Sequence, residues 1–241
     1  IEELAFTFSN AIAYIEHAVD RGLNIDDFCS RISFFFNGHN YFFEEIAKFR
    51  AARKLWSRIM KNRFNAKNNK ALLCRFHVQT AGSSLQAQQI DNNIVRTTIQ
   101  GLAAVLGGTQ SLHTNSKDEA LSLPTEEAAK LALRTQQVIA YESGVTDVVD
   151  PLAGSYYIES LTDKIEKEAS ELIKEIDEIG GAIPAIENHF QDNKISNSAF
   201  EYQKQIEEKK QIIVGTNKFI EDHNENNETL IIDQNAIDNQ L

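Results

Sequence analysis

Hydrophobic positions in the first 142 residues alternate between helical spacing and strand spacing. Apolar residues that recur every three to four positions predict helices at 4–21, 42–59, 91–106 and 125–142. Short apolar runs between these segments predict strands at 32–36, 71–78 and 109–113. Such alternation is typical of parallel β/α units. The spacing alone fits both a closed barrel and an open doubly wound sheet.

The pattern becomes mainly helical after Pro151. Residues 163–179 place Ile and Leu on one helical face and Glu and Lys on the other, which predicts a strongly amphipathic helix that ends at Gly180-Gly181. Further helix with several turns is predicted over 183–210, and a short strand over 212–215. The later part of the chain is therefore organised differently from the first.

The charge and the cysteine content exclude several classes of protein. A formal net charge of -11 disfavours nucleic acid and anionic lipid as partners, and no apolar run approaches the roughly 20 residues of a membrane helix. Cys29 and Cys74 form no CxxC pair and lie among apolar neighbours, which indicates buried free thiols in a reducing cytoplasm. The start has no signal peptide and no initiator Met, and three strands cannot close a barrel. We therefore expect a piece of a longer cytoplasmic protein.

Polar side chains follow the predicted strands, where parallel β/α folds place their active sites. The ends of the second and third strands combine imidazole, amide, hydroxyl and carboxylate groups: His77, Gln79, Thr80, His113, Asn115, Ser116, Asp118 and Glu119. A lone His after a strand is usually a hydrogen-bonded structural residue. Here two neighbouring strands each end in a His with an amide nearby, which favours a site for a polar ligand.

The familiar catalytic and metal-binding motifs are missing from the sequence. It has no CxxC, HExxH or EF-hand loop, and no GxGxxG, Walker or GxSxG motif. No nucleophile is supplied with an adjacent base, so hydrolysis and covalent catalysis are poorly supported. An external cofactor that carries the difficult chemistry fits the sequence better.

A series of ordered motifs runs from about residue 4 to residue 219. The longest are Arg31-Ile32-Ser33-Phe34-Phe35-Phe36, Arg75-Phe76-His77-Val78-Gln79-Thr80-Ala81-Gly82, Gly108-Thr109-Gln110-Ser111-Leu112-His113-Thr114-Asn115-Ser116, Asp118-Glu119-Ala120 and Asp150-Pro151-Leu152-Ala153-Gly154-Ser155-Tyr156-Tyr157. Together they closely resemble the methylmalonyl-CoA mutase family, one of the adenosylcobalamin-dependent acyl-CoA mutases.

This resemblance implies a fold and a mechanism. It implies that 1–158 form the C-terminal part of an acyl-CoA-binding TIM (β/α)8 barrel, with the CoA thioester threaded along the axis. A helical extension over 159–219 and an acidic linker or tail over 220–241 would follow. The implied reaction is a radical rearrangement that begins with homolysis of the Co–C bond of adenosylcobalamin. The protein would orient the reactants and exclude water.

On the substrate side, the resemblance assigns roles to five residues of the quoted motifs. Arg31 and Ser33 are similar to CoA contacts, and arginine presents a fork of donors that suits phosphate. His77 and Gln79 resemble catalytic groups of the substrate pocket, near the thioester and the corrin ring. Gln110 resembles a contact to the acyl-CoA chain.

On the cofactor side, five further residues match. Asn115 and Glu119, with the adjacent Ala120, are similar to ribose-side contacts to the adenosyl group. Gly82 and Ser83 resemble a corrin-facing loop, although many family members have Trp at the position of Ser83, so corrin packing there should differ. The family's axial His lies in a DxHxxG motif that this sequence lacks. The cobalt ligand is therefore expected from a separate domain or subunit, and no metal ligand from this chain.

Several interpretations of function stay open. The expected reaction interconverts (R)-methylmalonyl-CoA and succinyl-CoA, and the alternative substrates are isobutyryl-CoA and 2-hydroxyisobutyryl-CoA. A non-catalytic scaffold subunit of a mutase heterodimer and an unrelated barrel enzyme are the other hypotheses. The expected partners are an acyl-CoA and a cobalamin-binding domain or small subunit, in a dimer or heterotetramer, with neither nucleic acid nor membrane. The barrel's first half would carry further catalytic groups, so this chain by itself should be inactive.

Overall fold

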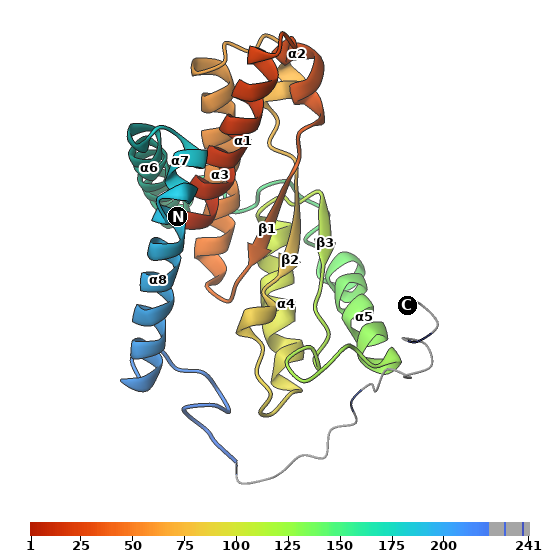
Figure 1. Cartoon of the computed structure of the whole chain (residues 1–241). Coiled ribbons are helices and arrows are strands. Elements are labelled where there is room, and N and C mark those ends of the chain that lie inside the picture. Colours follow the sequence, from red (N-terminus) through yellow and green to blue (C-terminus); the bar gives the residue numbers. More distant parts are fainter. Residues whose placement is uncertain (222–228, 230–237, 239–241) are drawn as a thin grey trace.

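A single parallel sheet lies at the centre of the structure, a computed structural model that describes residues 1–221, 229 and 238. Its strands are β1 (Phe34–Gly38), β2 (Phe76–Thr80) and β3 (Ser111–His113), in the order β1-β2-β3. Figure 1 shows the three strands side by side. The predicted parallel α/β arrangement is confirmed. Closure into a barrel stays a prediction, because the described residues contain three named strands, and most of the expected tail lies outside them.

Four helices match the four that were predicted from periodicity in the first part of the chain. These are α1 (Glu2–Asp20), α3 (Phe42–Asn62), α4 (Asn92–Leu106) and α5 (Glu126–Glu142). Helix α4 contacts all three strands and lies between α3 and α5. It stops where expected, since Gly108 takes a left-handed φ of 83°.

All three predicted strands begin later than expected, and β3 starts at Ser111 rather than at 109. β1 starts at Phe34 and includes Asn37 and Gly38, because parallel pairing with β2 continues until Gly38 aligns with Thr80. The first half of the predicted second strand is instead a short 3-10 helix, η2 (Asn69–Leu72). There the side chain of Asn68 accepts a hydrogen bond from the Lys70 amide at 3.0 Å, which closes a local turn.

Short helical turns occupy three of the connections. The polar segment after α1 contains α2 (Ile25–Phe28), which continues directly into the 3-10 helix η1 (Cys29–Arg31). Asn24 caps α2 by accepting the Asp26 amide at 3.1 Å. The loop after β2 contains another 3-10 helix, η3 (Gly82–Ser84).

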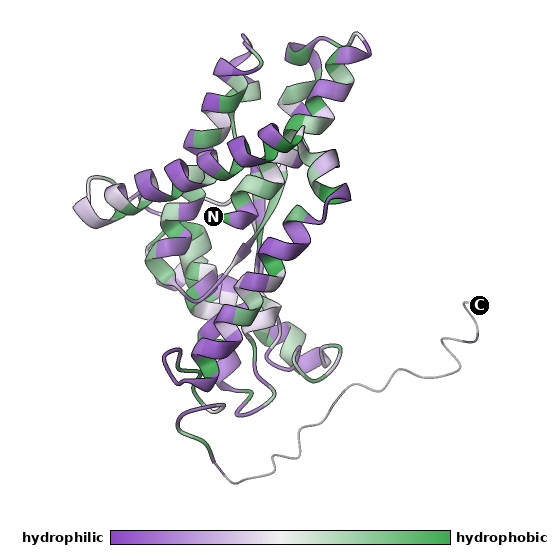
Figure 2. Ribbon diagram, turned by 60° about the vertical axis from the view of Figure 1, so that its left-hand side comes forward, coloured by the Kyte–Doolittle hydropathy of each residue, from purple (hydrophilic) through white to green (hydrophobic). Residues whose placement is uncertain are grey.

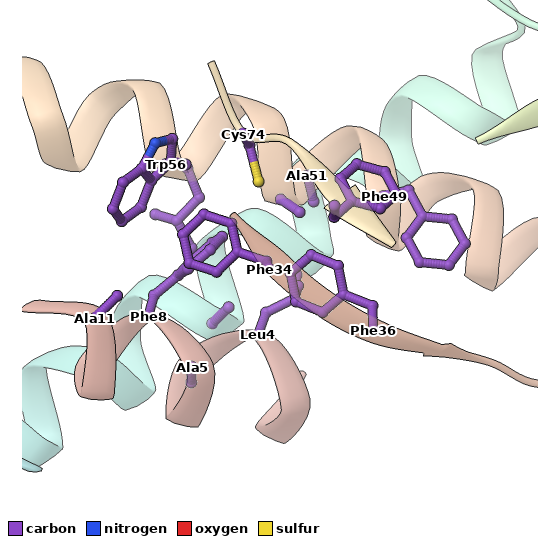
Figure 3. Close-up of a cluster of buried hydrophobic side chains, with 14 of the residues drawn as sticks. Leu4, Ala5, Phe8, Ala11, Phe34, Phe36, Phe49, Ala51, Trp56 and Cys74 are labelled. Atoms are coloured by element: carbon purple, nitrogen blue, oxygen red, sulfur yellow. The ribbon is translucent and has the colours of Figure 1, made fainter. Parts of the chain in front are cut away.

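The core is an aromatic cluster between the sheet and its helices (Figure 3). Phe8 of α1 meets Phe34 of β1 edge to face at 5.2 Å between ring centroids, and Trp56 of α3 meets Phe34 at 4.7 Å. Cys29 and Cys74 are buried free thiols, as predicted. Burial raises the pKa of Cys74 to about 12, which keeps this thiol protonated at neutral pH.

Three helices of the described chain follow Pro151: α6 (Tyr156–Ile179), α7 (Ala182–Glu187) and α8 (Phe190–Glu207). Helix α6 begins at Tyr156 rather than at 163, so it crosses the expected boundary at 158–159, and it ends at Gly180 as predicted. The strand predicted over 212–215 is wrong. Val214 forms an isolated bridge with Lys218, and within the described part of the chain no strand continues that pairing.

Helix α6 packs across α1 and α3, and opposite charges line its contact with α3. The helices in Figure 2 carry both hydrophobic and hydrophilic bands, as amphipathic helices do. Ion pairs join α3 and the adjacent Arg63 to α6 and the loop before it. We call them the ion-pair ladder: Arg50 with Asp150 and Glu159, Lys54 with Asp163 and Glu166, Arg58 with Glu166, and Arg63 with Asp177. Within the described residues, every helix is too short or too polar to span a bilayer.

Candidate functional site

The two faces of the sheet differ because side chains alternate along each strand. One row holds buried residues such as Phe34, Phe36 and Val78, which face the helices. The other row is half-buried or exposed, and the parallel register aligns its members across the strands. We call this side the open face, and its residues are Phe35, Asn37, His77, Gln79, Ser111 and His113.

His77 lies at the centre of the open face. Its Nδ1 is 2.7 Å from the Ser111 hydroxyl oxygen, and its ring lies 5.2 Å from that of Phe35. Ser111 and Phe35 are the register partners of His77, so the sheet itself brings these groups together. Within the described chain Nε2 has no hydrogen-bond partner, which leaves this nitrogen available to a ligand.

A chain of amide and carboxylate groups lies at the carboxyl end of the sheet. Gln79 donates from Nε2 to Asn115 Oδ1 at 3.2 Å, and Asn115 donates from Nδ2 to Glu119 Oε1 at 3.1 Å. The backbone N–H of Asn115 donates to the hydroxyl oxygen of Thr80 at 2.9 Å. These bonds fix the amide orientation of Asn115 and join the predicted substrate residue Gln79 to the predicted cofactor residues.

Gly82 brings the loop after β2 against the loop after β3. A Cβ at this position would lie 2.7 Å from Glu119 Oε1 and 3.0 Å from Asn115 Nδ2, so no side chain fits without displacing these groups. Ser83 and Ala120 follow Gly82 and Glu119 directly, and both are exposed. The five predicted cofactor residues therefore lie within two adjoining loops.

The two neighbouring carboxylates in this region have different surroundings. Burial alone would raise the pKa of Asp118, but hydrogen bonds from the Thr125 amide at 3.0 Å and hydroxyl at 3.1 Å outweigh it, and the pKa is lowered. Burial raises the pKa of Glu119, although nearby His113 partly opposes this shift. Asp118 therefore stabilises the start of α5, whereas Glu119 faces the site.

The remaining predicted residues lie at the amino end of the sheet. Arg31 and Ser33 are exposed just before β1. Gln110 precedes β3, where its Oε1 accepts the Phe76 amide at 2.6 Å and its Nε2 donates to the Gly108 carbonyl at 2.9 Å. A strand rises about 3.3 Å per residue, so roughly 13 Å of β2 separates this end from the other. The predicted site thus forms two groups, with His77 between them.

Sequence reasoning missed a buried lysine that supports the end of β1. Lys48 donates to Glu3 Oε2 and Glu45 Oε2, both at 2.7 Å, and to the Asn37 carbonyl at 2.8 Å. Burial alone would lower the pKa of Lys48, but the two carboxylates outweigh it and the pKa is raised. The available signal was a lysine on the apolar face of α3, beside Phe49.

The groups at the carboxyl end fit the sugar of a nucleoside better than they fit a metal. A carboxylate beside an amide suits two neighbouring hydroxyl groups, and the hydrogen bond that Asn115 donates to the Glu119 carboxylate uses Oε1, so that among the described residues Oε2 has no partner. Ser83 and Ala120, which follow Gly82 and Glu119, are both exposed. In the part of the chain that the structure describes, no three His, Cys, Asp or Glu side chains converge as metal ligands would.

Comparison with known proteins extends over the whole chain. The family model for methylmalonyl-CoA mutase matches residues 1–241. The large subunit of 2-hydroxyisobutanoyl-CoA mutase from Aquincola tertiaricarbonis is 46% identical over 239 residues, which is 99% of this chain and 42% of that protein.

Two methylmalonyl-CoA mutases are similar to the same extent. The Escherichia coli K12 enzyme is 48% identical over 240 residues, and the human mitochondrial enzyme is 44% identical over 240 residues. Each alignment covers 100% of this chain, but 34% and 32% of the respective enzymes. The chain thus spans between about a third and two fifths of the length of these relatives.

Proposed function

The chain belongs to the methylmalonyl-CoA mutase family, and from this premise we propose that the protein containing it rearranges the carbon skeleton of an acyl-CoA thioester. The finer proposal is interconversion of (R)-methylmalonyl-CoA and succinyl-CoA, supported by the names of the bacterial and human relatives. The observation that carries the proposal is the open face, a polar row flanked by candidate groups at both ends of one parallel sheet.

The proposed architecture is the C-terminal part of a (β/α)8 barrel over 1–158, with the helical extension after it. In such a barrel, one row of each strand faces the interior and the other faces the surrounding helices. The open face has the character of the interior row, and the helices that cover the other row have the character of the outer ring. An acyl-CoA lying along the open face would extend from the amino end to the carboxyl end.

The substrate contacts follow from these positions. Arg31 and Ser33 bind the phosphate-bearing part of CoA at the amino end, where both are exposed. His77 donates from Nε2 to the thioester carbonyl, while Ser111 holds the opposite ring nitrogen. Gln79 lies one row further on, at the reacting acyl group. Both polar ends of Gln110 already bond the backbone, so this residue contacts the acyl-CoA chain through its methylene groups.

The cofactor contacts lie at the carboxyl end. Asn115 and Glu119, with the adjacent Ala120, hold the ribose of the adenosyl group, and Gly82 and Ser83 face the corrin ring. When bound, adenosylcobalamin supplies radical chemistry through homolysis of its Co–C bond. The cobalt ligand comes from a separate domain or small subunit, in a dimer or heterotetramer. The role of this chain is to bind, orient and shield the reactants from water.

A second substrate has a specific observation in its favour. The Aquincola relative, named as the large subunit of 2-hydroxyisobutanoyl-CoA mutase, is as similar to this chain as the methylmalonyl-CoA mutases are. 2-Hydroxyisobutyryl-CoA is therefore the second candidate, with isobutyryl-CoA beside it. A non-catalytic scaffold subunit remains the rival hypothesis, and the hydrogen-bonded Gln79–Asn115–Glu119 chain argues against it. A cytoplasmic location stays a prediction.

Turnover of a panel of acyl-CoA esters tests this proposal. The full-length protein with its cobalamin-binding partner and adenosylcobalamin would be assayed with methylmalonyl-, isobutyryl- and 2-hydroxyisobutyryl-CoA. His77→Ala should lower kcat/KM by about 10²-fold or more. His17→Ala is the matched control, because His17 is exposed on α1 and distant in the sequence from every site loop. Absence of both turnover and CoA-ester binding would overturn the catalytic proposal.

A further inference from the structure

We propose that Gln100 is a positioning residue that ties the loop after β1 to the loop after β2 on the cofactor side of the site. This inference rests on the proposed function. Gln100 belongs to α4, which lies against the helix-covered face of the sheet, and its side chain is 0% exposed. Its hydrogen bonds nevertheless all reach loop residues at the carboxyl end of the strands.

The contacts of this amide are short and involve both loops. Gln100 donates from Nε2 to Asn40 Oδ1 and to Ser84 Oγ, each at 2.6 Å. Its Oε1 accepts from the Ala81 amide at 3.0 Å, and that amide also donates to the Gly38 carbonyl at 2.9 Å. Asn40 follows β1, whereas Ala81 and Ser84 follow β2. One buried side chain therefore connects two segments that are about 40 residues apart in sequence.

The network allows only one orientation of the amide. The hydroxyl of Ser84 donates to the Ala81 carbonyl at 2.7 Å, so its oxygen accepts from Gln100. Reversing the amide would direct its NH2 group at the Ala81 amide and its oxygen at Asn40 Oδ1. Both contacts would then be repulsive, and a buried unpaired group costs about 1–3 kcal/mol.

The connected loop continues to the cofactor residues. Gly82 lies between Ala81 and Ser84 in η3, and its backbone lies so close to Glu119 and Asn115 that a Cβ there would displace their side chains. A shift of this loop would therefore push Gly82 against the side chains of Asn115 and Glu119, the two ribose-side groups. Packing does not require an amide at Gln100, because an apolar side chain of similar length fills the same space. Its hydrogen bonds explain why an amide is present.

Three variants of the full-length protein with its cobalamin-binding partner test the role of Gln100. Gln100→Met keeps the length of the side chain and removes its hydrogen bonds, and Ser84→Ala removes one of them. Thr97→Val is the matched control. Thr97 also lies on α4 and is 2% exposed, and within the described residues its hydroxyl has no hydrogen-bond partner. The measurements are the Kd of adenosylcobalamin by absorbance titration, the KM of the acyl-CoA, and amide hydrogen exchange over 80–86 without ligand.

Gln100→Met should raise the Kd of adenosylcobalamin roughly tenfold, which is the effect of losing one to two net hydrogen bonds. The KM of the acyl-CoA should change by less than about twofold, because the CoA contacts lie at the other end of the sheet. Amide exchange over 80–86 should become about tenfold faster. Ser84→Ala should act in the same direction with a smaller effect, and Thr97→Val should change none of the three.

Unchanged cofactor affinity and unchanged exchange in Gln100→Met would overturn the proposal. Equal losses of substrate and cofactor affinity would also overturn it, because they indicate a general packing role. If the wild-type protein binds no adenosylcobalamin, the proposed function fails. The exchange measurement still decides in that case whether Gln100 holds the two loops.

Discussion

The two faces of the sheet come from the same strands but differ in what covers them. Phe34 and Phe36 face the helices and are 8% and 0% exposed, whereas Phe35 between them is 56% exposed. Three identical side chains in one strand have the same strand propensity, so their surroundings alone make the difference. The covered face stabilises the fold. The open face contributes little to stability, which leaves its side chains free to be selected for ligand contacts.

The largest expected effect is on the covered face. Phe36→Ala should lower the free energy of unfolding by about 3–5 kcal/mol, because it leaves a cavity among packed aromatic rings. Phe35→Ala removes the same atoms from the open face and should change the free energy of unfolding by about 0.5 kcal/mol or less. Urea denaturation of both variants of this chain measures the contrast. Similar losses in the two variants would contradict the comparison.

A buried charge gives the next largest effect. Lys48→Met leaves the carboxylates of Glu3 and Glu45 without their cation, and should cost about 3 kcal/mol at neutral pH. The pKa of Lys48 is raised above its ordinary value of 10.5 in the folded protein. Its contribution is therefore complete below about pH 10.5 and is lost as the pH rises through the folded pKa. Denaturation midpoints of wild type and variant should converge above that pH, and parallel curves would contradict this account.

The ion-pair ladder should contribute less. Glu166 is buried, but its partners Lys54 and Arg58 are 39% and 58% exposed. Glu166→Gln should therefore cost only about 1 kcal/mol, and less in about 1 M salt, where exposed charges are screened. Glu168→Gln on the same helix is the control, since among the described residues Glu168 pairs with Lys164 alone, at 3.9 Å, and the change should alter stability by about 0.3 kcal/mol. Equal costs would show that burial of the carboxylate is irrelevant.

The smallest effect on stability is expected on the open face itself. Ser111→Ala removes the hydroxyl that bonds Nδ1 of His77, and should change the free energy of unfolding by less than about 0.5 kcal/mol. The loss of that one orienting hydrogen bond should still lower kcat/KM by about tenfold. Steady-state kinetics and urea denaturation of the same preparation separate the two effects. Lost stability with full activity would reverse the assignment of roles to the faces.

Local pattern predicted the elements of the covered region well. The helical period placed α1, α3, α4 and α5, and Gly107-Gly108 marked the end of α4, because these signals depend on neighbouring residues. Strand limits were less accurate. Pairing with β2 keeps Asn37 and Gly38 inside β1, and that pairing depends on residues about 40 positions away. For residues 212–215 the opposite holds: within the described residues no strand pairs with them, so they form no strand.

The composition of the candidate site was predictable, but its arrangement was not. His77, Gln79 and Asn115 could be selected from strand ends and motifs, whereas the His77–Ser111 contact depends on the register of the sheet. Lys48 and Gln100 carry no motif. Each sits on a buried helix face, and its long-range partners become visible only after folding.

The strand order has a consequence for how such a sheet can be made in a cell. β2 is paired on both sides, but among the described residues β1 and β3 each have a neighbour on one side only. Their outer N–H and C=O groups therefore form two templates to which another extended chain can add. While ribosomes produce the protein, two nascent copies could join through these templates and begin an aggregate. Correct assembly then depends on which reaches β1 and β3 first, a strand of the same polypeptide or a second copy.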